Sequence, residues 1–318
     1  MAYKIMILGA SYGSLLGSKL AAAGHDVTLV CRQKTADLIN SKGTEVRIKL
    51  RGEDTHRSFF SMSLGGRTNA LTPEQAQPQE YDLICLAMQE PQYSHPSLRD
   101  LLSRVAKAKV ACMSIMNMPP LPYLKRISSL DCTKLTEAFL NPEIWSEFDP
   151  GLMTLCSPDP QAYRPPEEDP NVLHVGLPTN FKVSKFNNPE LDSMLENIAA
   201  DIDAFRVAGK DVPVKLRVFD SLFVPFAKWA MLATGNYRCI THTGPRSIQS
   251  SVHSNLAKSE SIYDFVNNLV VTLGADHSDM VPFAKYSAAA EGLRNPSSAA
   301  RAVFSGAINI ERVDKLIK

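Results

Sequence analysis

A short glycine-containing segment near the amino terminus has the residue types and spacing of a phosphate-binding turn. It consists of Gly9, Ala10, Ser11, Tyr12 and Gly13. A glycine turn between a strand and a helix lets the backbone approach a pyrophosphate, whose charge is stabilised at the helix amino terminus. Compared with the usual G-x-G-x-x-G pattern, this segment is shorter and has Ser11 where a glycine is expected. We predict a dinucleotide-binding turn; a purely structural turn in another α/β fold is the alternative.

The same five residues also have the pattern G-x-S-x-G, which marks the nucleophile elbow of serine hydrolases. An elbow follows a central strand of its sheet, after several other strands have already formed. Ser11 instead follows the first expected strand of the chain, Lys4–Leu8. We therefore reject a nucleophilic role for Ser11.

A basic residue occupies the position that distinguishes NAD sites from NADP sites, directly after the second expected strand. NAD-preferring sites place Asp or Glu here to bind the ribose 2′-hydroxyl. Strand Asp26–Cys31 is followed by Arg32, Gln33 and Lys34, which provide two cations and no acid. Because arginine binds phosphate through charge-assisted hydrogen bonds, Arg32 favours NADP. A solvated surface arginine is the alternative.

A single lysine interrupts the apolar segment Phe223–Asn236. Burying an unpaired charge costs several kcal/mol, so a lysine on an otherwise apolar helix is unusual. Lys228 has Phe226 and Trp229 beside it, and Asn236 lies two turns later on roughly the same face. Lys228 is a candidate general acid. The alternative is a half-buried lysine that extends its amino group to water.

Polar residues near the carboxyl terminus form a fourth candidate group. Ser297 and Ser298 follow Asn295 and Pro296, and Glu311 comes later. The serines can cap a helix, or they can hydrogen-bond a substrate carboxylate. These residues leave both possibilities open.

The elements that would position these residues alternate between strands and helices in the first half of the chain. Strand Lys4–Leu8, a helix from Gly13 to Gly24 and strand Asp26–Cys31 form a βαβ unit. Further expected elements are a hairpin of residues 44–50 and 57–62, strands 82–88 and 109–115, and a helix at about 97–107. This alternation predicts a Rossmann-type, doubly wound parallel sheet with helices on both faces.

The second half of the chain has a different pattern. Strands are expected at 151–156 and 171–176, with an acidic, proline-rich loop between them at 157–170. After about Asn188 only helices are expected, at 189–205, 215–234, 254–273, 279–293 and 297–305. We therefore predict a dinucleotide-binding domain at 1–195 and an all-helical domain for substrate binding and dimerisation at 196–318.

Composition excludes several classes of protein. The chain has 318 residues, of which 44% are hydrophobic and 21% charged, with a net charge of +1. Neither half has a run of Lys and Arg, so we expect no nucleic-acid partner and no membrane-surface binding. The six cysteines form no C-x-x-C pair and the histidines show no metal-ligand spacing, so we expect buried thiols in a reducing compartment and no metal. With no signal peptide and no run of about 20 apolar residues, we expect a cytoplasmic protein.

The amino-terminal half resembles the family of ketopantoate reductases and their relatives. The resemblance begins with GASYGSLLGSKLAAAGHDVTLVCR, which includes Arg32, and continues through DLICLAMQEPQ and SIMNMPP. It implies that Gln92 contacts the cofactor and that Asn117 lies near the nicotinamide.

The resemblance continues into the second half. AKWAMLATGN is similar to the helix that bears the family's catalytic lysine, which corresponds to Lys228, and Asn236 corresponds to a substrate-binding asparagine. NPSSAARAVFSGAINIE is similar to the segment that carries a substrate-binding serine, at Ser297 or Ser298, and an active-site glutamate, at Glu311 with a spacing mismatch of one residue.

Four residues depart from the family pattern. Gln89 replaces a lysine, Met118 and Ser11 replace glycines, and Leu232 replaces a substrate asparagine. These departures concern the substrate more than the fold. The chain also ends soon after Glu311, whereas relatives generally continue.

The expected function is an NADP-dependent reductase of a small 2-oxo acid or related carbonyl compound, with a homodimer as one candidate assembly. Hydride would come from the nicotinamide, Lys228 would protonate or polarise the oxygen, and Glu311 would hold the lysine or a substrate hydroxyl. An opine-type dehydrogenase is an alternative, for which His242, His253 and His277 are candidate bases. A non-catalytic dinucleotide-binding protein is a second alternative.

Overall fold

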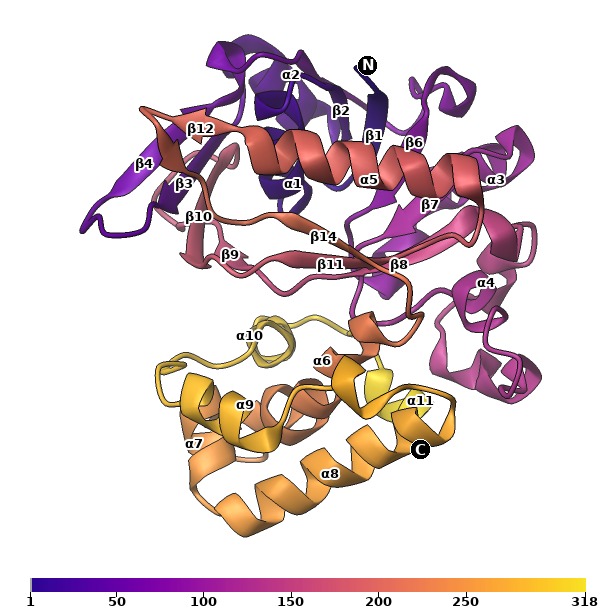
Figure 1. The fold of residues 1–318 in the computed structure, drawn as a ribbon, viewed down its shortest axis with the longest axis vertical. Helices are drawn as coiled ribbons and strands as arrows, with labels where there is room; N and C mark the ends of the chain where they lie inside the picture. Colours follow the sequence, from indigo (N-terminus) through magenta and orange to yellow (C-terminus); the bar gives the residue numbers. More distant parts are fainter. Residues whose placement is uncertain (1) are drawn as a thin grey trace.

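The computed structural model describes residues 2–318, and its amino-terminal part is built around an eight-stranded sheet (Figure 1). The strand order is β14-β11-β8-β7-β6-β1-β2-β5. The strands are β1 (Lys4–Leu8), β2 (Asp26–Val30), β5 (Thr68–Leu71), β6 (Leu83–Leu86), β7 (Ala111–Ser114), β8 (Met153–Ser157), β11 (Phe181–Ser184) and β14 (Leu216–Phe219). All neighbours from β8 to β5 pair in parallel, whereas β11 runs antiparallel to β8 and parallel to β14.

The sheet separates two hydrophobic cores because successive side chains of a strand point to opposite faces. In β1, Met6 and Leu8 belong to one core, and Ile5 and Ile7 belong to the other. The helices of the first part are α1 (Gly13–Ala22), α2 (Gln33–Lys42), α3 (Pro96–Ala108), α4 (Leu121–Leu124) and α5 (Pro189–Ala204). Helices α1, α2 and α5 contribute to the core of Ile5, and α3 and α4 contribute to the core of Met6. The predicted doubly wound Rossmann-type sheet is confirmed.

A second, four-stranded sheet has the order β4-β3-β10-β9. Its strands are β3 (Glu45–Lys49), β4 (His56–Phe60), β9 (Gln161–Tyr163) and β10 (Val172–Leu177). The antiparallel pairing of β3 with β4 confirms the predicted hairpin. The acidic, proline-rich loop 157–170 contains β9, which pairs antiparallel with β10. The loop is therefore partly ordered as an edge strand.

The sheet continues beyond the predicted domain boundary at 195/196, which falls inside α5 (Figure 1). The first three strands after this helix are β12 (Arg206–Val207) and β13 (Lys210–Asp211), which pair with each other, and β14. Strand β14 pairs in parallel with β11 from the Phe181–Leu216 pair onwards. Residues 196–219 therefore lie with the sheet, and the expectation that the chain is entirely helical after Asn188 was wrong.

The remainder of the chain is mostly helical and lies below the sheet in Figure 1. Its helices are α6 (Ala227–Met231), α7 (Ile248–His253), α8 (Leu256–Thr272), α9 (Phe283–Ala290), α10 (Ser298–Phe304) and α11 (Val313–Ile317), with a small hairpin of β15 (Ile240–Thr241) and β16 (Gly244–Pro245). The predicted single helix 215–234 was wrong in its first part, which is β14 and a loop. Its last part widens into a π-helical turn at Leu232–Asn236.

Two further findings concern the whole chain. All six cysteines are free, and four of them are buried. Among residues 2–318, no helix is long and apolar enough to cross a membrane.

Candidate active site

The glycine segment forms the tight turn between β1 and α1, as the sequence predicts. Gly9 adopts a φ of +107°, which side chains rarely allow. A Cβ atom on Gly9 would lie 2.5 Å from Met88 Cγ, and one on Gly13 would lie 2.7 Å from Ile7 Cγ2. Both glycines are therefore required for the close approach of this turn to β1 and to the end of β6.

The backbone amides of this turn are free to bind an anion. Gly9 N donates to Val30 O at 2.9 Å, but the amides from Ala10 to Gly13 donate no hydrogen bond within residues 2–318. Ser11 is exposed, and its carbonyl accepts the hydroxyl of Ser14 at 2.8 Å. The turn thus presents unpaired N–H groups at the amino terminus of α1, where negative charge is stabilised.

Arg32 follows β2 at the position that the sequence predicts, and it precedes the first residue of α2. Its side chain is exposed and makes no ion pair or hydrogen bond with any other described residue. No carboxylate occupies the adjacent positions Cys31, Gln33 or Lys34. A guanidinium group is therefore available at the end of β2.

Gln92 has a structural role that the sequence did not reveal. It lies in a 3-10 turn after β6, and its side-chain oxygen accepts the Gln89 amide at 3.0 Å. Gln89 and Gln92 thus cap this turn reciprocally. The cofactor contact of Gln92 stays a prediction.

Asn117 and Glu311, almost two hundred residues apart in the chain, meet at the carboxyl edge of the parallel strands. Asn117 Nδ2 donates to Glu311 Oε2 at 2.9 Å, and the Glu90 amide donates to Glu311 Oε1 at 3.4 Å. Asn117 Oδ1 is buried and has no hydrogen-bond partner among residues 2–318. Burial raises the pKa of Glu311, and the hydrogen bond from Asn117 opposes that shift.

Lys228 projects from α6 into the same region. Its side chain is 18% exposed, and its ammonium group donates to the carbonyl of Pro158 and lies 3.9 Å from Asp159 Oδ1. Burial lowers the pKa of Lys228, whereas the negative charges of Asp159 and Glu311 raise it. The next residue, Trp229, donates from Nε1 to Asn117 O at 3.3 Å, which ties α6 to the loop after β7.

The predicted substrate-binding residues lie at the other end of this helical segment. Ser297 is buried, donates to Asn236 O at 2.7 Å, and accepts the Ala300 amide at 3.1 Å as the cap of α10. Ser297 therefore has the capping role that the sequence left open. Ser298 is exposed, and neither it nor Asn236 uses its side chain in a hydrogen bond within the described chain.

Sequence reasoning missed the contribution of the proline-rich loop. The hydroxyl of Tyr12, in the glycine turn, donates to Pro160 O at 2.7 Å, and Lys228 contacts the neighbouring residues Pro158 and Asp159. The sequence feature that could have indicated this contribution is the acidic, proline-rich loop 157–170, which the family pattern does not require. Its contacts could not be predicted because Pro160 lies 148 residues from Tyr12 in the chain.

A second missed residue is Glu90, which is 2% exposed. Its carboxylate accepts the Leu140 amide at 3.1 Å, and its backbone amide contacts Glu311. Burial, followed by the nearby charge of Glu311, raises the pKa of Glu90 to about 7. Two carboxyl groups therefore share a buried region beside Asn117.

The candidate bases of the opine-type alternative are not brought to this site. His253 contacts Ser287 O at 3.0 Å within the helical part, whereas His242 and His277 are exposed. None of them contacts Lys228 or Glu311 within residues 2–318. In the same range, no group of three or more His, Cys, Asp or Glu side chains could hold a metal ion.

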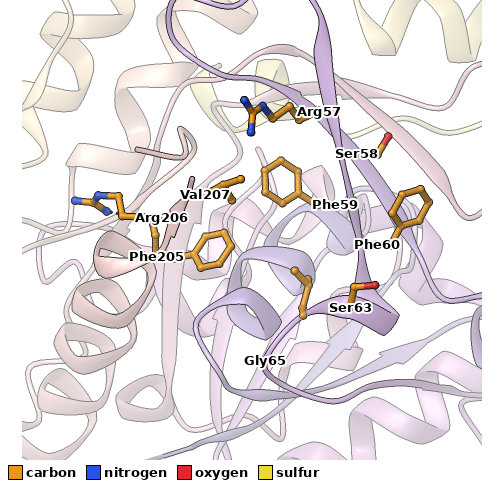
Figure 2. Close-up of a pocket in the computed structure, with 10 residues that line it drawn as sticks. Arg57, Ser58, Phe59, Phe60, Ser63, Gly65, Phe205, Arg206 and Val207 are labelled. Atoms are coloured by element: carbon orange, nitrogen blue, oxygen red, sulfur yellow. Dashed lines mark hydrogen bonds between the residues drawn. The ribbon is translucent and has the colours of Figure 1, made fainter. Parts of the chain in front are cut away.

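A separate hollow of about 610 Å³ lies on the second sheet (Figure 2). Phe59 and Phe60 of β4 line it together with Phe205 and Arg206, which follow α5. It contains none of the predicted site residues, so it is distinct from the candidate active site.

Part of the chain matches a known family. Residues 5–117 match the family model described as ketopantoate reductase PanE/ApbA. This segment extends from β1 to Asn117 and includes the glycine turn and Arg32. Among curated protein sequences, none matches the chain significantly.

Solved structures of low sequence identity share the fold over nearly the whole chain. A probable 2-dehydropantoate 2-reductase from Bacillus subtilis is 15% identical, with a TM-score of 0.58 and coverage of 95% of this chain and 87% of that one. D-mandelate dehydrogenase, solved with NADH and anilino(oxo)acetate, is 13% identical, with a TM-score of 0.62 and coverage of 99% and 90%. A dimeric ketopantoate reductase from Staphylococcus aureus is 9% identical, with a TM-score of 0.58 and coverage of 95% and 85%. At these identities the likeness establishes the fold.

Proposed function

We propose that this protein is an NADP-dependent oxidoreductase, because residues 5–117 match the family model of ketopantoate reductase PanE/ApbA and nearly the whole chain shares the fold of solved reductases. Its substrate would be a small 2-oxo acid or a related carbonyl compound. The observation that carries this proposal is the Asn117–Glu311 hydrogen bond, which joins the edge of the nucleotide-binding sheet to the helical part beside Lys228.

The residues of the glycine turn and of the β2 end fit a phosphorylated dinucleotide. The free amides from Ala10 to Gly13 would bind the pyrophosphate, and Arg32 would bind the 2′-phosphate. Asn117 has a buried side-chain oxygen that finds no partner among residues 2–318, which fits a hydrogen-bond donor on the nicotinamide end. When bound, NADPH supplies the hydride.

Lys228 would supply the proton or the positive charge that the reduced oxygen requires. A fixed cation near a developing negative charge stabilises it with little reorganisation, and the effect is stronger where water is excluded. Glu311 would fix the position of the loop after β7 relative to the helical part that carries Lys228, through its contacts with Asn117 and the Glu90 amide. Asn236 and Ser298, whose side chains are free, would orient the substrate; Ser297 would support Asn236 through its backbone carbonyl.

The substrate class is supported by a protein of the same fold. D-mandelate dehydrogenase was solved with NADH and with anilino(oxo)acetate, which has a carbonyl group next to a carboxylate, as a 2-oxo acid does. In this chain Arg32 at the end of β2 favours NADPH over NADH, because its charge matches a 2′-phosphate. The dimeric ketopantoate reductase of the same fold supports a homodimer as the assembly, which light scattering would test.

The first experiment is a calorimetric titration of the wild-type protein with NADPH and with NADH. We expect NADPH to bind more tightly, and Arg32→Ala to remove that preference while NADH affinity stays unchanged. Arg51→Ala is the matched control, because Arg51 is an exposed arginine in the turn between β3 and β4.

Turnover is then tested with a panel of 2-oxo acids. For each compound, the oxidation of NADPH is measured as the decrease of its ultraviolet absorbance. Binding of neither nucleotide would contradict the proposal at its first step. NADPH binding without oxidation on any carbonyl compound would instead support the non-catalytic alternative, and a requirement for an amine co-substrate would support the opine-type alternative.

A further inference from the structure

The segment Ser157–Pro160, called the strap below, starts at the end of β8 and contacts both the glycine turn and Lys228. Its two proline carbonyls are both used as acceptors. Pro160 O accepts the Tyr12 hydroxyl at 2.7 Å, and Pro158 O accepts the Lys228 ammonium group. The strap therefore connects the glycine turn to the residue proposed as the proton donor.

The carboxylate of this strap lies between two lysines. Asp159 Oδ1 is 3.9 Å from Lys228 Nζ, and Asp159 Oδ2 is 3.3 Å from Lys182 Nζ on β11. Asp159 is 20% exposed, and Lys228 is 18% exposed, so water screens their attraction only partly. Ser157 Oγ donates to Asp159 Oδ1 at 2.5 Å and fixes the orientation of the carboxylate.

We propose that Asp159 is a positioning residue, which holds the Lys228 ammonium group charged and in place at the site of reduction. The catalytic part of this inference rests on the proposed function. The contacts of Lys228 with Pro158 and Asp159 are present without a cofactor. The Pro158 carbonyl fixes the direction of one N–H bond, and Asp159 supplies the compensating charge. A lysine in this position without a carboxylate would tend to lose its proton because burial disfavours the charged form.

The other charged groups that face Lys228 do not replace Asp159. Glu311 raises the pKa of Lys228 less than Asp159 does, and burial also disfavours its own ionised form. Lys182 opposes protonation of Lys228, and the thiol of Cys156 is buried in β8 with a raised pKa. Asp159 is therefore the principal partner of Lys228 on the strap side.

The test is the titration of Lys228 in the cofactor-free protein, measured by NMR after labelling of the lysine side-chain nitrogen. The resonance is assigned by its loss in Lys228→Met. In Asp159→Asn we expect the midpoint of Lys228 to fall by about one pH unit or more, which is about a tenfold decrease in the ammonium-to-amine ratio. Asp159→Glu should restore part of the shift, since it keeps the charge.

Asp169→Asn is the matched control, because it removes the same charge from the same loop. In the wild type, Asp169 pairs with the exposed Lys42 at 3.2 Å and not with Lys228. We expect it to leave the Lys228 midpoint unchanged. An unchanged midpoint in Asp159→Asn, or an equal shift in Asp169→Asn, would overturn the proposal. Thermal unfolding of each variant shows whether the fold is retained.

A second readout links this titration to activity. If the oxo-acid panel identifies a substrate, the alkaline limb of the kcat/KM profile should move to lower pH in Asp159→Asn. A shifted titration in a protein that binds no nucleotide would support the role of Asp159 and contradict the proposed function. Reductase activity together with a Lys228 titration that does not respond to Asp159→Asn would support the proposed function and contradict the role of Asp159.

Discussion

Lys228 holds a cationic group where burial favours the neutral amine. The groups that oppose this effect are Asp159, at 3.9 Å, and the buried Glu311. Burial therefore lowers the pKa of Lys228, and the two carboxyl groups limit that shift. At the residue scale, the charge state of Lys228 therefore depends on a few contacts from separate parts of the chain.

Substitution Lys228→Met tests the proposed role directly, because methionine keeps an unbranched side chain only one atom shorter and removes the charge. We expect kcat for the reduction to fall by about 10²–10⁴, as is typical for loss of a general acid, while NADPH affinity stays unchanged. Steady-state kinetics and calorimetric titration measure the two effects. Lys258→Met, at an exposed position of α8, is the control. Full turnover in Lys228→Met would assign proton donation to another group.

The residues of the site differ in how far the sequence could reveal them. Lys228 was identifiable because a charge in an apolar helical segment conflicts with its surroundings. Asp159 was not, because an acid in an acidic, proline-rich loop has a local pattern typical of solvated surface. Its partner Lys228 lies about seventy residues later in the chain, and only the folded structure brings the two side chains together.

At the scale of elements, the β1–turn–α1 unit depends on the absence of side chains at two positions. Gly13 begins α1 directly against β1, and a Cβ atom there would lie 2.7 Å from Ile7 Cγ2. Gly13→Ala should therefore lower the free energy of unfolding by about 1–3 kcal/mol, as overpacking of a core commonly does. It should also weaken NADPH binding, because the free amides of the turn would shift.

Chemical denaturation and nucleotide titration measure these two effects. Gly292→Ala is the matched control, because a Cβ atom at Gly292 would have ordinary contact at 3.7 Å from Ala289 O. Unchanged stability and unchanged affinity in Gly13→Ala would show that the turn tolerates displacement and that its glycines are not needed for the site.

The same scale shows where sequence patterns were insufficient. The βαβ unit and the β3–β4 hairpin were predictable because their signals are local. The segment Leu216–Phe219 was predicted as helix, because a short, largely apolar run followed by an apolar helix does not distinguish the two structures. It forms β14 because β11 offers an unpaired edge, and that partner lies more than thirty residues earlier in the chain.

At the scale of the whole molecule, the sheet and the helical part meet at two buried carboxyl groups. Glu311 comes from the segment between α10 and α11, and Glu90 follows β6. The Glu90 amide contacts Glu311 at 3.4 Å, and both carboxyl groups are at most 5% exposed. Because ionisation of both would place two negative charges in this junction, stability should depend on pH.

The direction follows from the pKa of Glu90, which burial and then Glu311 raise from 4.5 to about 7. Between these two values the folded state retains a proton that the unfolded state has lost, so the free energy of unfolding falls as pH rises through this window. One pKa unit corresponds to about 1.4 kcal/mol, so the contribution of Glu90 has an upper limit of about 3.5 kcal/mol.

Glu90→Gln should therefore be more stable than the wild type at pH values above the window and should equal it below. The amide oxygen retains the acceptor for Leu140, and the substitution removes the negative charge. Urea denaturation at a series of pH values measures the difference, with Glu260→Gln, on the exposed face of α8, as the control. Parallel pH curves for the wild type and Glu90→Gln would mean that Glu90 titrates normally and that the junction is open to water. A difference that grows as pH rises would show that this junction excludes water, which is the condition under which Lys228 and Glu311 can act on a substrate without competition from solvent.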